Sequence, residues 1–244
     1  MKYIESITDF FKSPKWTMNM LLGAVCAIIP FVGPMVLMGW LLNGFWGRSD
    51  EKAETFPDFN FDQFGKNLER GLWPTLVSMV GGFVLVPVMG VVALVSMLVL
   101  GGAASVGGGR TGGGLAILMM LMIGVVMLVL IMALMFILTP MVLRAALTQD
   151  FASAFNLPFV KQFLSLTKTE LALSMLFMGV AGIVLMVVSS VPCIGILLIF
   201  PVVPVINFGW IHLTKQLYKL YLSRGGEEIS LSPKLTDAAP PSVM

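Results

Sequence analysis

The sequence predicts an all-α integral membrane protein with about six membrane segments, paired as three helical hairpins. Apolar residues make up 57% of the chain and charged residues 11%, whereas soluble domains average about 45–50% and about 25%. The charged residues are also clustered, which leaves four uncharged runs that each exceed the roughly 20 residues needed to cross a bilayer. These runs are Trp16–Gly47, Gly71–Gly109, Thr111–Leu143 and Leu171–Thr214.

The motif Pro-x-x-Gly interrupts these apolar runs three times. Proline removes a backbone donor and clashes with the preceding turn, and glycine accepts the positive φ that a sharp reversal needs. The alternative is that each proline only kinks a continuous helix, since membrane helices tolerate proline. The residues expected to form turns at the outer surface of the membrane are Pro30, Gly33, Pro87, Gly90, Pro192 and Gly195.

The runs can then fold as three hairpins, over about 16–47, 71–143 and 171–214. The first hairpin is the shortest, because its leading arm, Trp16–Ile29, would be only about 21 Å long at about 1.5 Å per residue. This hairpin either spans the membrane fully or enters and leaves on the same side as a re-entrant pair.

The distribution of basic residues decides between the possible numbers of crossings. One crossing per run would place eight Lys and Arg on the amino-terminal side and seven on the other, which is no bias. A fifth crossing in the last run would give four against eleven, which is acceptable with the amino terminus outside. With three hairpins, fourteen of the fifteen lie on one side with all thirteen acidic residues, and only Arg110 lies opposite. By the positive-inside rule the shared side is the cytoplasm. We therefore expect a multi-pass protein of the cell (inner, cytoplasmic) membrane with both termini in the cytoplasm.

The charge pattern also predicts the domain organisation. We expect a single polytopic membrane domain over residues 1–222 and a disordered cytoplasmic tail over 223–244. The tail is polar and contains proline, and such a composition does not bury enough apolar surface to fold.

A phenylalanine-rich cytoplasmic segment precedes each predicted hairpin, and the three segments hold ten of the seventeen phenylalanines. In the third segment, phenylalanine recurs every four residues from Phe151 to Phe163, as on one face of a helix. Each segment is therefore predicted to form an amphipathic helix in the headgroup plane, with its apolar face toward the lipid. The second and third segments also share Phe-Asn-apolar, at Phe59–Phe61 and Phe155–Leu157, which favours an internal repeat.

Three stretches together resemble a known family: "IIPFVGPMVLMGW", "FPDFNFDQFGKNLERGL" and "DFASAFN". They are similar to the bacterial and archaeal multi-pass membrane proteins catalogued as domain of unknown function 4013. The similarity covers about Ser13–Tyr221, and the glycine-rich stretch 101–114 is a departure from the family pattern. The resemblance implies a multi-pass α-helical fold and supplies no catalytic residues.

The sequence contains no pattern typical of catalysis or metal binding. It has one histidine and two cysteines, Cys26 and Cys193, both in apolar runs, where a thiol usually packs as a small hydrophobe. The stretch 101–114 contains Gly107-x-Gly109-x-x-Gly112, but no strand precedes this dinucleotide-like pattern, and we expect a flexible outer linker. We expect no cofactor, no metal and no enzymatic activity.

Three residues are weak candidates for a functional role. Arg110 is expected to face headgroups or a partner on the outer side. Asn207 follows Pro201 and Pro204, which are expected to break the last helix and free its carbonyl groups, so Asn207 is a candidate for lining a binding cavity. His212 is predicted to lie at the membrane interface, with a proton relay as the alternative.

Two functions therefore remain open. The first is a non-enzymatic scaffold, assembly or accessory subunit of a membrane complex, which contacts other membrane proteins through its cytoplasmic helices and tail. The alternative is a permease or channel-like transporter subunit. A lipid-modifying enzyme would need acids and bases at membrane depth, which the sequence lacks. The expected partners are the lipid bilayer and other membrane proteins, and no nucleic acid is expected.

Overall fold

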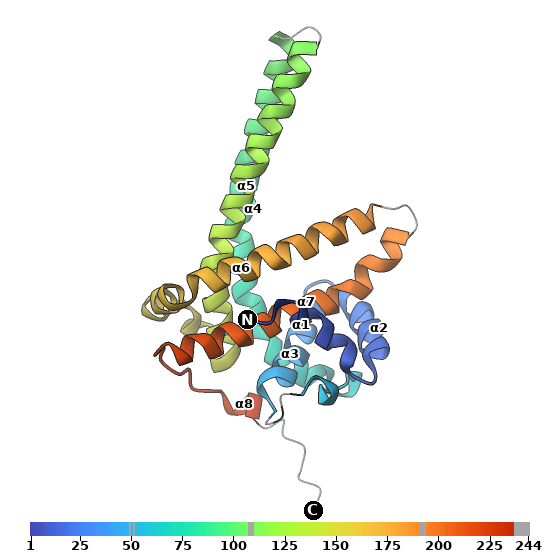
Figure 1. Ribbon diagram of the computed structural model, residues 1–244, viewed down its shortest axis with the longest axis vertical. Helices are drawn as coiled ribbons and strands as arrows, with labels where there is room; N and C mark the ends of the chain where they lie inside the picture. Colours follow the sequence, from blue (N-terminus) through green and yellow to red (C-terminus); the bar gives the residue numbers. More distant parts are fainter. Residues whose placement is uncertain (49, 51, 107–109, 191–193, 237–244) are drawn as a thin grey trace, which may run out of the picture. The chain divides into compact units, whose positions relative to one another are not determined.

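Figure 1 shows the computed structural model of the chain, which describes residues 1–48, 50, 52–106, 110–190 and 194–236. These residues contain helices and no strands, so the predicted all-α class is confirmed. The α-helices are α1 (Tyr3–Thr8), α2 (Trp16–Ala27), α3 (Val32–Trp46), α4 (Phe64–Val106), α5 (Arg110–Thr148), α6 (Leu157–Ser189), α7 (Ile194–Ser223) and α8 (Pro233–Thr236). The 3-10 helices are η1 (Asp9–Lys12), η2 (Ala53–Thr55), η3 (Phe61–Gln63) and η4 (Ala152–Phe155).

The chain forms two compact units. Met1–Val77 and Thr139–Met244 make up the first, which we call the folded unit, and Ser78–Leu138 make up the second, which we call the hairpin unit. Three helical stretches are long and apolar enough to cross a membrane: Phe61–Leu98, Ile117–Thr148 and Leu157–Leu185. The protein is therefore a helical membrane protein, as its composition predicts.

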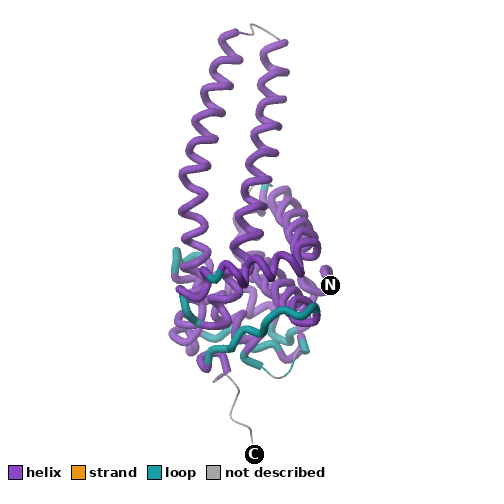
Figure 2. Tube along the Cα trace, turned by 90° about the vertical axis from the view of Figure 1, so that its left-hand side faces the viewer, coloured by secondary structure: helices purple, strands orange, loops and turns teal. Residues whose placement is uncertain are grey.

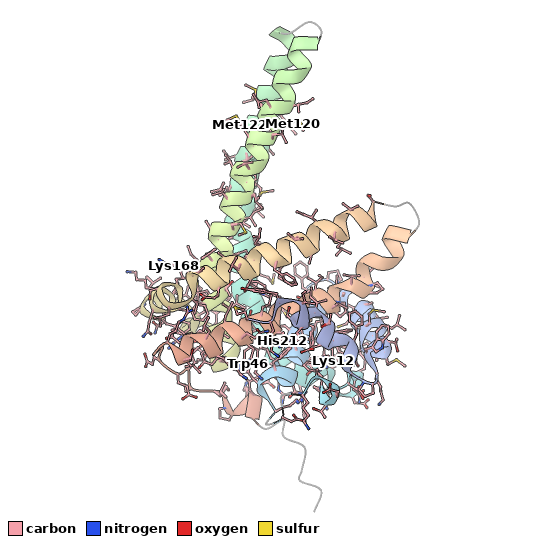
Figure 3. All side chains as sticks on the ribbon, viewed as in Figure 1. Lys12, Trp46, Met120, Met122, Lys168 and His212 are labelled. Atoms are coloured by element: carbon pink, nitrogen blue, oxygen red, sulfur yellow. The ribbon has the colours of Figure 1, made fainter. Side chains whose placement is uncertain are left out.

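The hairpin unit consists of the second part of α4 and the first part of α5, which run antiparallel beside each other (Figures 1 and 2). Where the two helices meet, Gly81 lies against Leu138, and a Cβ atom at Gly81 would overlap the Leu138 side chain. Large apolar side chains are exposed on both helices, among them Phe83 of α4 and Met120 and Met122 of α5 (Figure 3). A helix that is apolar all round is surrounded by other apolar material in its native setting.

The expected turn at Pro87 and Gly90 is wrong, because α4 continues through both residues. The alternative of a proline within a continuous helix applies here, since a membrane helix loses only a local hydrogen bond at proline and retains the rest. The glycine-rich stretch also differs from the expected flexible linker: residues 101–106 and 110–114 are helical, and 107–109 lie outside the described residues.

The first predicted turn lies between α2 and α3. The amide of Val32 donates to the carbonyl oxygen of Pro30 at 2.6 Å, and Phe31 between them has φ 61° and ψ −53°, which is a γ-turn. Gly33 does not supply the positive φ that we expected of it. A Cβ atom at Gly33 would overlap the carbonyl oxygen of Cys26, so this glycine lets α2 and α3 approach each other.

Helices α6 and α7 form a further helix pair within the folded unit (Figure 1). Pro192 lies outside the described residues, and Gly195 lies in the first turn of α7. The expected break at Pro201 and Pro204 is wrong, because α7 is continuous through both residues. The ring of Pro204 packs against Gly23 of α2, where a Cβ atom would lie 2.6 Å from the ring.

Helix α3 is largely buried in the folded unit, where α2, α7 and α8 contact it. The first turns of α4 cross it closely: Gly39 of α3 abuts the backbone of Asn67, and Gly71 of α4 abuts the carbonyl of Met35. Trp40 is 2% exposed, and its Nε1 donates to the carbonyl oxygen of Pro57 at 2.9 Å. Protein side chains and backbone, and not lipid, therefore surround α3.

The lengths of α2 and α3 limit what this pair can do in a bilayer. With 12 and 15 residues, they measure about 18 Å and about 22 Å at about 1.5 Å per residue, against about 30 Å of hydrocarbon. One face of α2 is apolar and exposed, at positions three or four residues apart: Met18, Leu21, Val25 and Ile28. This face is available for lipid.

The phenylalanine-rich segments fold differently from the prediction. Half of their phenylalanines are buried in the folded unit instead of facing lipid: Phe10, Phe56, Phe59, Phe159 and Phe163. Phe56, for example, contacts the rings of Phe45 and Phe208, with centroids 5.1 and 4.9 Å apart, and such ring pairs stabilise beyond their buried area. Between α3 and α4, the described residues form η2 and η3 and no α-helix, so the expected interfacial helix is not found among them.

The prediction of a disordered tail is wrong for the described residues that follow α7. Ile229 is 3% exposed and Leu235 is fully buried. The amide of Ser232 donates to the carbonyl oxygen of Leu147 at 2.8 Å, and Arg70 Nε donates to the carbonyl oxygen of Lys234 at 2.9 Å. The segment 224–236 is therefore a strap that ties α7 to α5 and to the start of α4; residues 237–244 lie outside the described residues.

Candidate functional site

The folded unit contains a small polar cavity of about 30 Å³ where η1, the end of α3, η2 and α7 meet. Its polar lining comes from Asp9, Arg48, Lys52, His212 and Lys215. Aromatic rings of Phe45, Phe56 and Phe208 form the rest of the wall. A cavity of this size holds about one or two water molecules.

His212 is held in this cavity by ring contacts and lies close to a carboxylate. Its ring stacks on Phe45 with centroids 5.3 Å apart, and it meets Phe208 edge-on at 6.0 Å. His212 Nδ1 lies 3.9 Å from Asp9 Oδ2, and it has no hydrogen-bond partner within the described part of the chain. The imidazole of His212 on α7 thus lies near the carboxylate of Asp9 on η1 without a direct hydrogen bond between Nδ1 and Oδ2.

The cationic side chains of the cavity bind backbone carbonyls. Lys215 Nζ donates to the carbonyl oxygen of Phe45 at 2.6 Å, next to the carboxyl end of α3, where a cation complements the helix dipole. Arg48 donates to the carbonyl oxygen of Lys52 at 3.0 Å and to Thr55 Oγ1 at 2.7 Å. Burial lowers the pKa of Arg48 from its ordinary value, and nearby Asp50 opposes this shift.

The loop at the rim of the cavity is closed by Asp50. Its carboxylate accepts from Thr55 Oγ1 at 2.7 Å and from the amide of Lys52 at 2.9 Å. The Thr55 hydroxyl is the first cause of a lowered pKa at Asp50, followed by the Lys52 amide. The carboxylate therefore stays ionised beside Arg48, and both charges serve to shape the loop.

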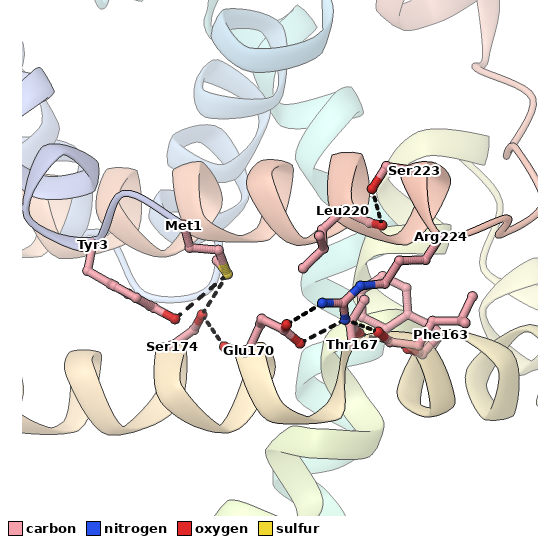
Figure 4. Close-up of polar contacts among 10 residues, drawn as sticks. Met1, Tyr3, Phe163, Thr167, Glu170, Ser174, Leu220, Ser223 and Arg224 are labelled. Carbon is pink, nitrogen blue, oxygen red and sulfur yellow. Dashed lines mark hydrogen bonds and ion pairs between the residues drawn. The ribbon is translucent and has the colours of Figure 1, made fainter.

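A second group of polar contacts joins α1, α6 and α7 (Figure 4). Glu170 of α6 accepts from both terminal nitrogens of Arg224, with N–O distances of 3.0 and 2.5 Å. Arg224 also donates to the carbonyl oxygen of Leu166. Ser174 Oγ donates to the carbonyl oxygen of Glu170 at 2.7 Å and contacts Met1 Sδ at 3.9 Å. The planar guanidinium fork thus connects the end of α7 to the middle of α6.

The three candidates from the sequence do not come together in one site. Arg110 is the first residue of α5, and its side chain lies outside the described part of the structure. Asn207 turns back on its own helix, where its Nδ2 donates to the carbonyl oxygen of Val203 at 2.9 Å. His212 lies five residues further along α7, so at about 100° per residue it points about 140° away from Asn207.

Sequence reasoning placed Lys215 beside His212 but missed Asp9 and Arg48. These two residues lie far from His212 in the chain, and no spacing rule links them to it before α3, η1 and α7 are packed together. One signal in the sequence could have indicated that Arg48 and Lys215 lie near each other: each directly follows the end of an apolar run. Among the described residues, no group of three or more His, Cys, Asp or Glu is placed to hold a metal ion.

Comparisons with known proteins support the resemblance seen in the sequence. The model of the family described as "Protein of unknown function (DUF4013)" matches residues 22–194. No curated protein and no solved structure matches the chain. The matched region covers α3, both helices of the hairpin unit and α6, and hence most of the two units described above. The chain therefore belongs to the DUF4013 family.

Proposed function

We propose that the protein is a non-enzymatic accessory or scaffold subunit of a complex in the cell (inner) membrane. The observation that carries this proposal is the hairpin unit, whose two helices expose large apolar side chains along their length, including Phe83 (69%) and Met122 (62%). Arg110 is the only charged residue in the sequence of this unit, and the apolar surface of the two helices is suited to apolar helices of a partner within the bilayer.

The same proposal includes a topology. Both termini lie in the cytoplasm, the α4–α5 and α6–α7 pairs span the membrane, and the α2–α3 pair is re-entrant. The charge distribution supports this arrangement, because it leaves Arg110 as the only basic residue outside. The short lengths of α2 and α3, together with the burial of α3 by protein, support the re-entrant form of the first pair.

The alternative, a permease or channel-like subunit, needs polar groups that converge on a water-filled path. Three polar side chains within α6 and α7 favour the scaffold instead, because each hydrogen-bonds to its own helix. Ser174 donates to Glu170, Asn207 donates to Val203, and Thr214 donates to the carbonyl oxygen of Trp210 at 2.8 Å.

Photo-crosslinking in native membranes tests the proposal. Benzoylphenylalanine at Phe83 or at Met122 reports on the hairpin unit, and the same residue at Phe31 is a control of equal exposure (65%) in the α2–α3 turn. We expect a discrete protein adduct at 83 or 122 and none at 31, and mass spectrometry of the adduct identifies the partner.

The matched biochemical test is purification in mild detergent at native expression. A membrane protein that co-purifies in fixed stoichiometry supports the accessory role. A solitary protein whose hairpin positions crosslink to lipid alone contradicts it and favours transport, which substrate-uptake assays would then test.

A further inference from the structure

The folded unit presents an open groove between α1 and α6, with a volume of about 720 Å³. Binding sites for small ligands usually measure about 300–1,000 Å³ and are lined mainly by apolar groups. On one side the groove is lined by residues 1–5, and on the other by Leu173, Leu176, Phe177 and Val180 of α6. Its size and lining are thus those of a binding site for an apolar ligand.

Specific contacts hold the two walls of the groove in place. The rings of Tyr3 and Phe177, one from each wall, lie with centroids 5.7 Å apart. The backbone amide of Lys2 donates to Gln216 Oε1 of α7 at 2.7 Å, which fixes the start of α1. The walls remain uncovered by the described residues, since Ile4 is 72% exposed and Leu176 is 61% exposed. The groove is therefore a preformed feature of the fold and has room for an occupant.

Charged side chains lie along one wall of the groove and beside one of its ends. On the wall formed by residues 1–5, Lys2 pairs with Glu5 at 2.7 Å. Beside the Leu173 end, Glu170 pairs with Arg224 at 2.5 Å, one turn before Leu173 (Figure 4). From there the groove follows α6 for about 10 Å, at about 1.5 Å per residue, as far as Val180. The groove thus presents charged groups of both signs and then apolar side chains. This is the order in which a bilayer presents its headgroups and its hydrocarbon.

The groove is continuous with an apolar surface on the same helix. Beyond Val180, the exposed residues of α6 are Ile183, Val184 and Val187, and the stretch Leu157–Leu185 is one of the three that can cross a membrane. A hydrocarbon chain that lies against this part of α6 can therefore extend into the groove without leaving an apolar surface.

We propose that this groove binds one bilayer phospholipid, with an acyl chain along Leu173–Val180 and the headgroup at the Leu173 end, beside the Glu170–Arg224 pair. A phosphate that carries an amine, as in phosphatidylethanolamine, matches the mixed charges at this end. The lipid holds α1 against α6 and so adds to the stability of the folded unit.

A photoreactive lipid tests this site in the full-length protein. The protein is placed in phosphatidylethanolamine nanodiscs that contain the same lipid with a diazirine on one acyl chain, then irradiated, digested and mapped by mass spectrometry. Every lipid-facing helix will be labelled, so the informative product is acyl-chain label on residues 1–5, which contain Lys2 and Glu5. We expect label there and on Leu173–Val180.

Two tryptophan variants at matched positions of α6 separate the groove from ordinary lipid contact. Leu176→Trp fills the groove, and Ile183→Trp adds the same bulk at a site of equal exposure (63%) outside it. We expect Leu176→Trp to lower the label on residues 1–5 several-fold and Ile183→Trp to leave it unchanged. Absence of label on residues 1–5 in the wild type, or an equal loss in both variants, would overturn the proposal.

Native mass spectrometry in detergent gives a second readout. We expect one phospholipid to remain bound to the wild type and to the Ile183→Trp variant and to be lost from the Leu176→Trp variant. If the wild type retains only detergent, the groove is not a phospholipid site. This result does not depend on whether the hairpin unit binds a partner protein.

Discussion

At the scale of single residues, the shared Phe-Asn-apolar pattern has a clear structural role. Asn60 Oδ1 accepts from the amide of Asp62 at 2.9 Å at the start of η3, and Asn156 Oδ1 accepts from the amide of Phe159 at 2.9 Å at the start of α6. In both places asparagine caps the amino end of a helix, where the first amides lack partners. The motif that favours an internal repeat thus marks two similar helix starts.

Removal of one cap tests this role. We expect Asn156→Ala to destabilise the protein by about 1 kcal/mol, which lowers the Tm by about 2–4 °C in a chain of this size. Asn156→Asp should keep most of the stability, because a carboxylate also accepts from the Phe159 amide. Thermal unfolding in detergent, followed by circular dichroism, compares the variants. Equal losses for Ala and Asp would show that the asparagine acts in another way.

The buried leucine of the strap is also a single-residue feature. Leu235 is fully buried while Leu231 is 40% exposed, so the two positions form a matched pair four residues apart. We expect Leu235→Ala to cost about 2–5 kcal/mol of unfolding free energy and Leu231→Ala to stay within about 0.5 kcal/mol of the wild type. Denaturant unfolding measures both. Similar stabilities for the two variants would mean that the strap contributes little to the fold.

At the scale of elements, the close crossing of α3 and α4 depends on glycine. Gly39 and Gly71 lie where the backbones of the two helices touch, and small residues permit such an approach. Sequence reasoning explained the glycines of the Pro-x-x-Gly motifs as turn residues and did not anticipate this crossing. A glycine within an apolar run has the same appearance whether it serves a turn, a helix contact or neither.

A pair of glycine variants within α4 tests the crossing. A Cβ atom at Gly71 would overlap the carbonyl oxygen of Met35, whereas one at Gly65 would meet nothing. We therefore expect Gly71→Ala to lower the free energy of unfolding by about 1–3 kcal/mol, because the backbone at Met35 cannot move aside as a side chain can. Gly65→Ala should be neutral or stabilising by up to about 1 kcal/mol, because alanine favours the helix. Denaturant unfolding measures the stability of both variants. A Gly71→Ala variant as stable as the wild type would contradict the close crossing of α3 and α4.

The elements that the sequence predicted well are those that depend on composition over many residues. The all-α class and the long apolar helices α4, α5 and α6 follow from apolar runs, which any bilayer requires. The polar cavity around His212 depends on contacts between segments far apart in the chain, so no local pattern could show it. Phe56 and Phe59 were assigned to lipid for the same reason, since an apolar residue suits lipid and a protein core equally.

At the scale of the whole molecule, the division into two units separates two kinds of apolar surface. The folded unit has a protein core around Trp40 and Phe208, with aromatic and aliphatic side chains packed on each other. The hairpin unit leaves most of its apolar side chains exposed, so they need lipid or a partner. The folded unit thus has an internal source of stability that the hairpin unit lacks, and the hairpin unit is the part suited to membrane partners.

The proposed topology predicts which positions are reached from outside the cell. Single cysteines at Arg110, Phe31 and Ser230 are introduced in a background with Cys26→Ala and Cys193→Ala. Intact cells are then treated with a membrane-impermeant maleimide. We expect label at 110, because it follows the outer end of α4, and none at the cytoplasmic 230. We also expect none at 31, because α2 is only about 18 Å long and its turn stops short of the far side.

Permeabilised cells should label 230, which controls for the reactivity of that cysteine. Label at 31 in intact cells would instead show that the α2–α3 pair crosses the whole membrane. Label at 230 without label at 110 would show that the protein has the opposite orientation.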